Sequence, residues 1–203
     1  MSLRLRAADG SLAAWSPASY PKVLLLVDVV DAGPLSAARV FATGAAASGA
    51  LTFLGYEPVR SVGKDADLRV AVSPGPGPGL IVAPSSIEED GLKSRGFSGE
   101  DFHYFCLKTH SRKPLPFSWD GLAAARAELG DLRASVRALS GVSLEPSSRG
   151  VTGYLHRFRE ALGADFDFPE ALSCVWDGLR PGALSPGSKA ALLRAALPAL
   201  GLE

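Results

Sequence analysis

Hydrophobic residues in the first part of the chain cluster in short runs, a spacing typical of β-strands. Residues 3–6 and 12–15 are two such runs, and Asp9-Gly10 between them predicts the tight turn of a β-hairpin. Residues 22–30, KVLLLVDVV, form a nearly continuous run of leucine and valine. A run of this kind predicts a strand that is buried on both faces of a parallel sheet.

The pattern then changes to one long helix followed by more strands. Residues 35–54 are rich in alanine and predict a helix that ends at Gly55. Residues 58–62 predict another strand, which completes a βαβ unit with a right-handed crossover. Residues 73–79, SPGPGPG, lie between two further apolar runs. Their prolines remove the amide donors that a phosphate-binding loop needs, so we interpret this segment as a stiff connector.

The second half of the chain has the periodicity of amphipathic helices. Ser98 and Asp101 form a weak variant of the capping box with which a helix begins. This helix is expected to place Phe102 and Phe105 on its buried face and His103 away from that face.

Two prolines, Pro114 and Pro116, end this helix, because proline lacks the amide donor and restricts the residue before it. Ser118 is the expected cap of a long second helix with an apolar stripe. The stripe consists of Leu122, Ala125, Leu129, Leu132, Val136 and Leu139. Three further helices are expected, over residues 154–162, 168–179 and 188–200.

Composition narrows the class of protein. The 203 residues include 47% hydrophobic ones, enough for a substantial core, and 21 basic residues balance 21 acidic ones. This balance argues against a protein whose main task is to bind phosphate backbones.

Cys106 and Cys174 belong to no Cys/His cluster, and we expect both to be buried apolar side chains. No apolar run reaches the roughly 20 residues of a membrane helix, and residues 1–10 lack a signal-peptide core, so we expect a soluble cytoplasmic protein.

A family resemblance is carried by residues 96–125, GFSGEDFHYFCLKTHSRKPLPFSWDGLAAA. The segment resembles the part of cysteinyl-tRNA synthetases that follows the KMSKS loop, where a pattern GYSPEDFRYFCL…HYRSPLNFSWEAL joins the nucleotide-binding fold to a helical bundle. The resemblance implies a class I synthetase architecture in reduced form. A Rossmann-like α/β domain over residues 1–95 would precede an all-α bundle over 96–203, which resembles the region that contacts the tRNA stem.

The same alignment implies that the HIGH motif is lost. The tetrad falls on Pro34-Leu35-Ser36-Ala37, and the following Ala38-Arg39 agrees with the family. The two family histidines stabilise charge on the triphosphate as the adenylate forms, and proline and alanine offer no donor for that task. We therefore assign no catalytic residue.

Two further parts of the enzyme site are missing in this alignment. The KMSKS loop would lie just before Ile87, yet residues 80–86, LIVAPSS, contain no lysine to balance the pyrophosphate charge. The first zinc-ligand cysteine of the family falls on Asp28, and the chain has no other Cys/His group to replace the metal site. Zinc is predicted to be absent, with no metal ligand assigned.

Three residues remain as candidates for a remnant cofactor pocket. Asp28 and Asp31 flank the carboxyl end of the first buried strand, the position at which open α/β sheets bind ligands. Arg39 lies early in the following helix. An arginine in that position is more often structural than ligand-binding.

The leading functional hypothesis is a truncated, catalytically degenerate paralogue of cysteinyl-tRNA synthetase that serves as a binding or scaffold module with an unknown partner. Self-association through the edge of the shortened sheet would provide one partner. A second hypothesis is a ligase that activates cysteine or another small acid with ATP through Asp28, Asp31 and Arg39. A third is a tRNA-binding module, which the net charge does not support. No membrane partner is expected.

Overall fold

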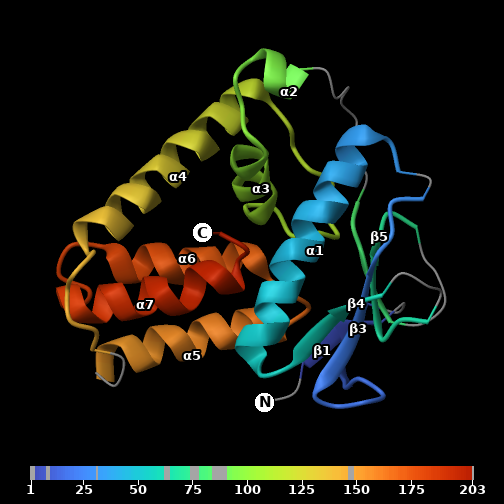
Figure 1. Ribbon diagram of the computed structural model, residues 1–203, viewed down its shortest axis with the longest axis horizontal. Helices are drawn as coiled ribbons and strands as arrows, with labels where there is room; N and C mark the ends of the chain where they lie inside the picture. The colour runs from blue at the N-terminus through green and yellow to red at the C-terminus, as the bar shows by residue number, and fades with distance from the viewer. Residues whose placement is uncertain are drawn as a thin grey trace.

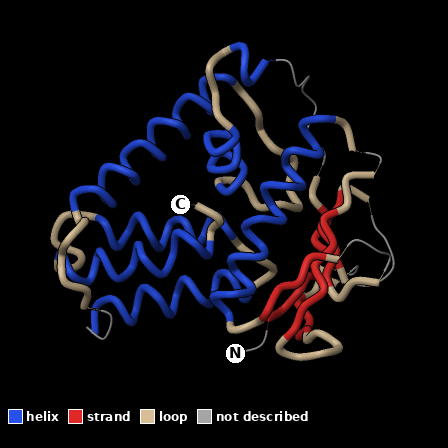
Figure 2. Tube along the Cα trace, viewed as in Figure 1, coloured by secondary structure: helices blue, strands red, loops and turns tan. Residues whose placement is uncertain are grey.

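A four-stranded parallel sheet forms one side of the protein (Figure 1, Figure 2). The computed structural model describes residues 3–7, 10–30, 32–61, 65–73, 78–83, 91–145 and 149–202. The strands are β3 (Lys22–Val27), β4 (Glu57–Arg60), β5 (Leu68–Ala71) and β6 (Gly79–Ile81), in the spatial order β4-β3-β5-β6. All three pairings are parallel. The predicted parallel sheet is therefore confirmed.

The N-terminal hairpin forms a separate two-stranded sheet. It pairs β1 (Leu3–Arg6) with β2 (Leu12–Trp15) in antiparallel register, with Leu3 opposite Trp15. Leu3 and Leu5 are buried. The hairpin prediction is thus confirmed, although Asp9 of the expected turn lies outside the described residues.

One face of the sheet is covered less than the sequence suggested. In β3, Val23 and Leu25 are buried at 0% and 5% exposure, whereas Leu24 between them is 39% exposed. Helix α1 (Pro34–Leu54) packs on the inner face, on the side of the helical bundle (Figure 1). The expectation that β3 is buried on both faces is wrong, because apolar character in a strand does not reveal how many layers cover it.

Helix α1 connects the sheet to the bundle. It begins at Pro34, where the missing amide hydrogen breaks no hydrogen bond, because amides in the first turn of a helix have no acceptor within the helix. The helix is capped at its end by Gly55, which has the left-handed backbone conformation. Between Ser36 and Leu54 it is long and apolar enough to span a membrane by length and composition alone. Half of that stretch is buried inside the protein, the arrangement of a core helix.

The remaining helices form the bundle, and local caps set where several of them begin. Ser98 and Asp101 form a reciprocal capping box, Ser118 accepts a hydrogen bond from the amide of Gly121, and Asp167 accepts one from the amide of Glu170. The helices are α2 (Gly91–Ser94), α3 (Gly99–Leu107), α4 (Trp119–Ala138), α5 (Arg149–Gly163), α6 (Phe168–Leu179) and α7 (Pro186–Ala199).

The apolar core runs without interruption from the sheet into the bundle. A single cluster of buried residues includes Val23 and Leu68 of the sheet, Leu51 of α1, and Leu132 and Phe158 of the bundle. The predicted stripe of α4 is buried from Leu122 to Leu132, but Val136 is 40% exposed. The division into two domains at residue 95 remains a prediction.

Both edge strands of the sheet are protected in the part of the chain that the structure describes. The amide of Glu57 in β4 donates to the carbonyl of Pro21 just before β3, and the amide of Ser61 just after β4 donates to that of Leu25 in β3. Pro58 therefore faces outward, where it has no amide hydrogen to donate. At β6, the Gly79 carbonyl accepts from Arg112, and the Ala83 amide donates to the Ser111 carbonyl. These features cover part of each edge, and self-association through the sheet edge remains a prediction.

Gly49 provides a stability test of the packing between α1 and α7. A Cβ atom at this position would lie 2.2 Å from the carbonyl oxygen of Pro198. We expect Gly49→Ala to lower the free energy of unfolding by about 1–3 kcal/mol through overpacking, measured by urea denaturation. Gly130→Ala is the matched control, because nothing lies within 4 Å of its added methyl group; it should stabilise by about 0.5–1 kcal/mol. Unchanged stability of Gly49→Ala would contradict this helix contact.

Candidate functional site

Asp28 lies directly after β3, as predicted, where its carboxylate is already engaged. Its Oδ2 accepts from Nη2 of Arg69 at 2.5 Å, and its Oδ1 accepts from the amide of Val30 at 2.9 Å. The Val30 amide and then Arg69 lower the pKa of Asp28, so the carboxylate is ionised and paired. Asp31, the second candidate, lies outside the described residues.

Arg39, the third candidate, is completely buried. Its guanidinium donates to three main-chain carbonyls, those of Ala83 at 2.7 Å, His110 at 3.2 Å and Lys113 at 2.8 Å. Burial lowers the pKa of Arg39, yet a guanidinium keeps its charge at any physiological pH. Arg39 therefore clamps α1 to the connection between α3 and α4, and its ligand-binding role remains a prediction.

A second buried arginine contact holds the same connection from the other side. Asp165 is 1% exposed and accepts from Arg112 through both oxygens, at 2.6 Å from Nε and 2.7 Å from Nη2. It also accepts from the amide of Arg6, and its own amide donates to the carbonyl of Arg4. The sequence analysis gave Asp165 no role, because its partners are distant along the chain.

His110 lies beside this ion pair. Its Nε2 is 3.8 Å from Oδ2 of Asp165, and its Nδ1 accepts from the amide of Arg112 at 3.3 Å. Burial lowers the pKa of His110 and outweighs the attraction of Asp165, since Arg112 already balances that carboxylate. His110 thus acts in local packing and hydrogen bonding.

His103 corrects an expectation. It was placed away from the buried face of α3, but it is 9% exposed, and its Nε2 lies 2.8 Å from the carbonyl oxygen of Leu200 after α7. Because a carbonyl only accepts, Nε2 carries the hydrogen. Burial lowers the pKa of His103, which keeps the ring neutral.

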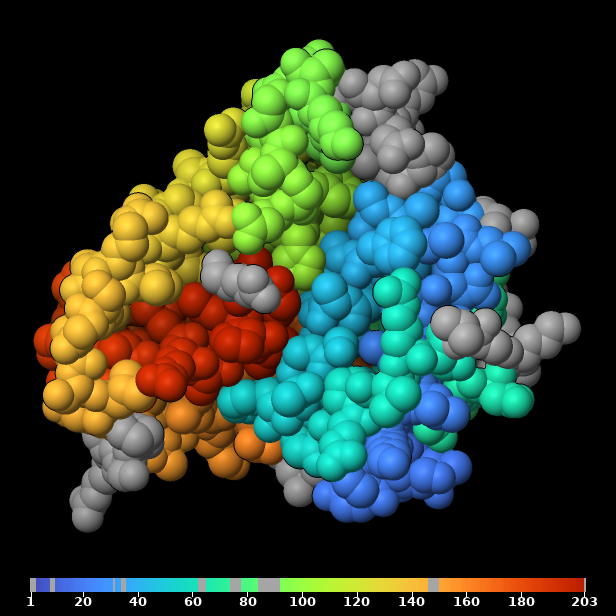
Figure 3. Space-filling view, viewed as in Figure 1, coloured from blue at the N-terminus to red at the C-terminus, as the bar shows by residue number. Residues whose placement is uncertain are grey.

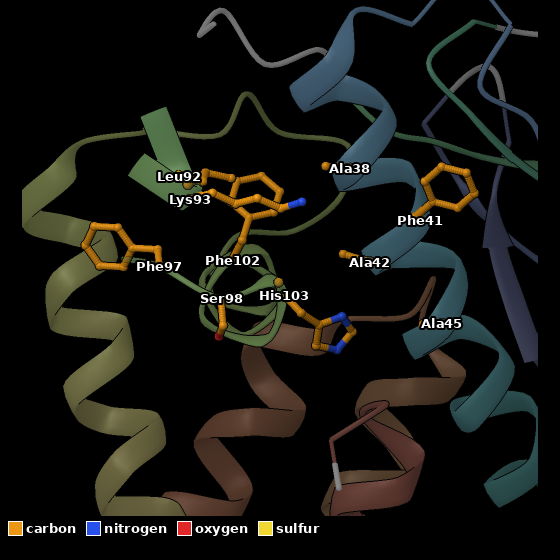
Figure 4. A pocket seen from close by; sticks show the side chains of 11 residues that line it. Ala38, Phe41, Ala42, Ala45, Leu92, Lys93, Phe97, Ser98, Phe102 and His103 are labelled. Atoms are coloured by element: carbon orange, nitrogen blue, oxygen red, sulfur yellow. The ribbon is translucent and has the colours of Figure 1, made fainter. Parts of the chain in front are cut away.

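A cavity of about 590 Å³ adjoins His103 between α1 and the α2–α3 segment (Figure 4). In the space-filling view the green surface of α2 and α3 lies beside the light-blue surface of α1 (Figure 3). The cavity is mostly apolar and contains one cationic side chain, Lys93, among the described residues that line it. The lining residues are Ala38, Phe41, Ala42, Ala45, Leu92, Lys93, Phe97, Ser98, Gly99, Phe102 and His103.

Among the described residues, no group of three or more His, Cys, Asp or Glu side chains could hold a metal ion. Asp28, at the position of the family's first zinc ligand, instead pairs with Arg69. The absence of zinc remains a prediction.

Comparison with known proteins places these features in context. Over 92 residues the chain is 35% identical to a cysteine–tRNA ligase of Chlamydia caviae, covering 42% of this chain and 19% of the ligase. It is 37% identical over 81 residues to the ligase of Thioalkalivibrio sulfidiphilus, covering 40% and 17%, and 32% identical over 130 residues to that of Treponema pallidum, covering 55% and 25%. The chain is similar in sequence to part of the cysteine–tRNA ligases.

The resemblance inferred from residues 96–125 is therefore confirmed. This cysteine–tRNA ligase-like chain spans about a fifth of the length of the curated relatives it matches. No model of an established protein family matches it.

The Arg112–Asp165 pair is expected to dominate the stability of this region. Asp165→Asn should lower the free energy of unfolding by about 3–5 kcal/mol, because it leaves a largely buried guanidinium without its counter-charge. Arg157→Ala is the matched control, since Arg157 pairs with Asp177 at 3.3 Å on the surface and should contribute at most about 1 kcal/mol. Urea denaturation of both variants tests the ranking, and equal losses would refute it.

The two buried histidines make stability depend on pH. Their folded-state pKa values lie below the unfolded value, so the unfolded chain binds protons first as the pH falls below about 6.5. The free energy of unfolding should therefore decrease on acidification, by at most about 1.4 kcal/mol per pH unit for each histidine, until the folded pKa is reached.

Urea denaturation between pH 7.5 and pH 5 measures this slope. The slope should become shallower in the double variant with His103→Gln and His110→Gln. It should be retained in His156→Gln, which alters an exposed histidine on α5. A double variant with the wild-type slope would assign the effect to other groups.

Proposed function

We propose that this chain is a non-catalytic binding module built on a cysteine–tRNA ligase-like framework. The observation that carries the proposal is the state of Arg39, the residue that follows the position of the HIGH tetrad. Its guanidinium is committed to three main-chain carbonyls, those of His110 and Lys113 in the α3–α4 connection and that of Ala83 after β6. A guanidinium committed in this way is not available for a triphosphate.

The second charged residue of the candidate site, Asp28, supports the same conclusion. Asp28 is paired with Arg69, and the residues at the HIGH position, Pro34 to Ala37, offer no imidazole. Stabilising a developing phosphate charge requires donors that are preorganised and otherwise unoccupied. The alternative, a ligase that uses ATP to activate cysteine or another small acid, would have to break these contacts before it could bind a nucleotide.

Binding of tRNA is not favoured by the bundle surface. Arg133 pairs with Glu100, and Arg157 pairs with Asp177 and Glu170. Arg126 lies 5.8 Å from the ring centre of Phe97. Basic side chains that are already neutralised or packed release few counterions from a phosphate backbone.

A cytoplasmic location is part of the proposal. Both cysteines, Cys106 and Cys174, are free and buried, which fits a reducing compartment. Burial raises the pKa of Cys106 to about 12, so its thiol is inert at neutral pH.

Pyrophosphate exchange tests the loss of catalysis. The purified chain, incubated with ATP, cysteine and labelled pyrophosphate, should give no exchange above a protein-free blank, because the residues that handle phosphate charge are absent or committed to structure. A complete cysteine–tRNA ligase assayed in parallel provides the positive control. Cysteine-dependent exchange that disappears in Asp28→Ala would overturn the proposal in favour of the ligase alternative.

A further inference from the structure

The cavity beside α1 exists because that helix presents small side chains to α3. Ala38, Ala42 and Ala45 follow one another at spacings of four and three, which places them on one face of α1. Methyl groups do not reach across to α3, and a cavity of about 590 Å³ is left between the helices (Figure 4). This volume is within the range of small-molecule sites.

The opposite wall is built from larger apolar side chains. Leu92 of α2, Phe97 in the turn before α3 and Phe102 of α3 line the cavity, and Phe102 is 3% exposed. Phe41 of α1 also lines it and is 49% exposed, a high value for a phenylalanine. Such walls favour the apolar body of a ligand by removing its surface from water.

Lys93 sets the charge of the cavity. In Figure 4 its ammonium group extends from α2 into the space facing Ala38 of α1. It forms no ion pair with a described residue, and no described residue that lines the cavity is acidic. His103, the other titratable side chain in the lining, is neutral and bonded to Leu200. Among the described residues, the cavity therefore combines an apolar interior with one positive charge that has no acidic partner.

We propose that this cavity binds an amphipathic carboxylate, with its apolar body between α1 and α3 and its carboxylate at the ammonium group of Lys93. The site lies on the face of α1 that turns towards α3, whereas Asp28 follows β3 in the sheet. The inference names a ligand class for the binding module proposed above and rests on that function. The two proposals can be rejected independently, because pyrophosphate exchange tests the non-catalytic function and direct binding tests the carboxylate site.

Isothermal titration calorimetry of the full chain with decanoate and with 1-decanol, an uncharged ligand of the same chain length, tests the site. Decanoate is expected to bind at least tenfold more tightly than 1-decanol, because both bury the same apolar chain but decanoate alone pairs with Lys93. Lys93→Met should weaken decanoate binding about tenfold and leave 1-decanol unchanged. Lys113→Met, which removes an exposed lysine outside this cavity, should bind both ligands as the wild type does.

A second pair of variants locates the binding. Ala45 is exposed and lines the cavity, so Ala45→Trp fills it without altering the core and should abolish binding of both ligands. Val136→Asp places a charge in a different apolar groove, between α4 and α7, and should leave binding intact. Thermal melting confirms that each variant is folded.

Three outcomes would overturn the proposal. The first is a wild-type chain that does not bind decanoate. The second is a Lys93→Met variant with wild-type affinity for decanoate. The third is binding that survives Ala45→Trp but is lost in Val136→Asp.

Discussion

Two arginines, the buried Arg39 and the partly buried Arg112, hold the connection between α3 and α4, and the arrangement of the sheet and the bundle depends on them. Arg39 of α1 donates to two carbonyls of this connection, those of His110 and Lys113, and to the carbonyl of Ala83 after β6. Arg112, within the connection, donates to Asp165 and to the carbonyl of Gly79 on β6. A buried guanidinium is costly unless all its surroundings are in place. These contacts therefore make the sheet edge, α1, the connection and the α5–α6 turn mutually dependent.

The composition of α1 has two opposite consequences for packing. At Gly49 the helix has no side chain, and the backbone of α7 approaches so closely that a methyl group would collide with it. Nearer its start, at Ala38, Ala42 and Ala45, equally small residues face α3 and leave a cavity. The difference lies in the partner: α7 presents backbone close to α1, whereas α3 stands further away and fills only part of the gap with Phe102. The small residues of α1 thus allow a close backbone contact with α7 at one position and leave a cavity beside α3 at another.

Local signals predicted the elements well, and long-range contacts explain what they missed. The capping box of Ser98 and Asp101 and the end of α1 at Gly55 depend on residues a few positions apart, so the sequence determines them directly. The burial of His103 depends on the turn at Leu200, 97 residues away. The network of Asp165 joins it to Arg6, 159 residues away. No periodicity within one helix could reveal either contact, and the exposure of Leu24 depends on a layer that the strand itself does not encode.

The same distinction separates the enzyme-like features of this chain from its binding features. The segment from which the sequence analysis inferred the resemblance includes helix α3 and the connection after it, and hydrogen bonds of this segment hold the fold together. Of the residues that the sequence analysis proposed for a remnant site, Arg39 and Asp28 are engaged in structural contacts. Selection for the framework alone would preserve this combination, since Arg39 and Arg112 stabilise the fold whether or not chemistry takes place. Lys93 at the apolar cavity makes none of these framework contacts among the described residues, and it is therefore the side chain on which the proposed ligand site depends.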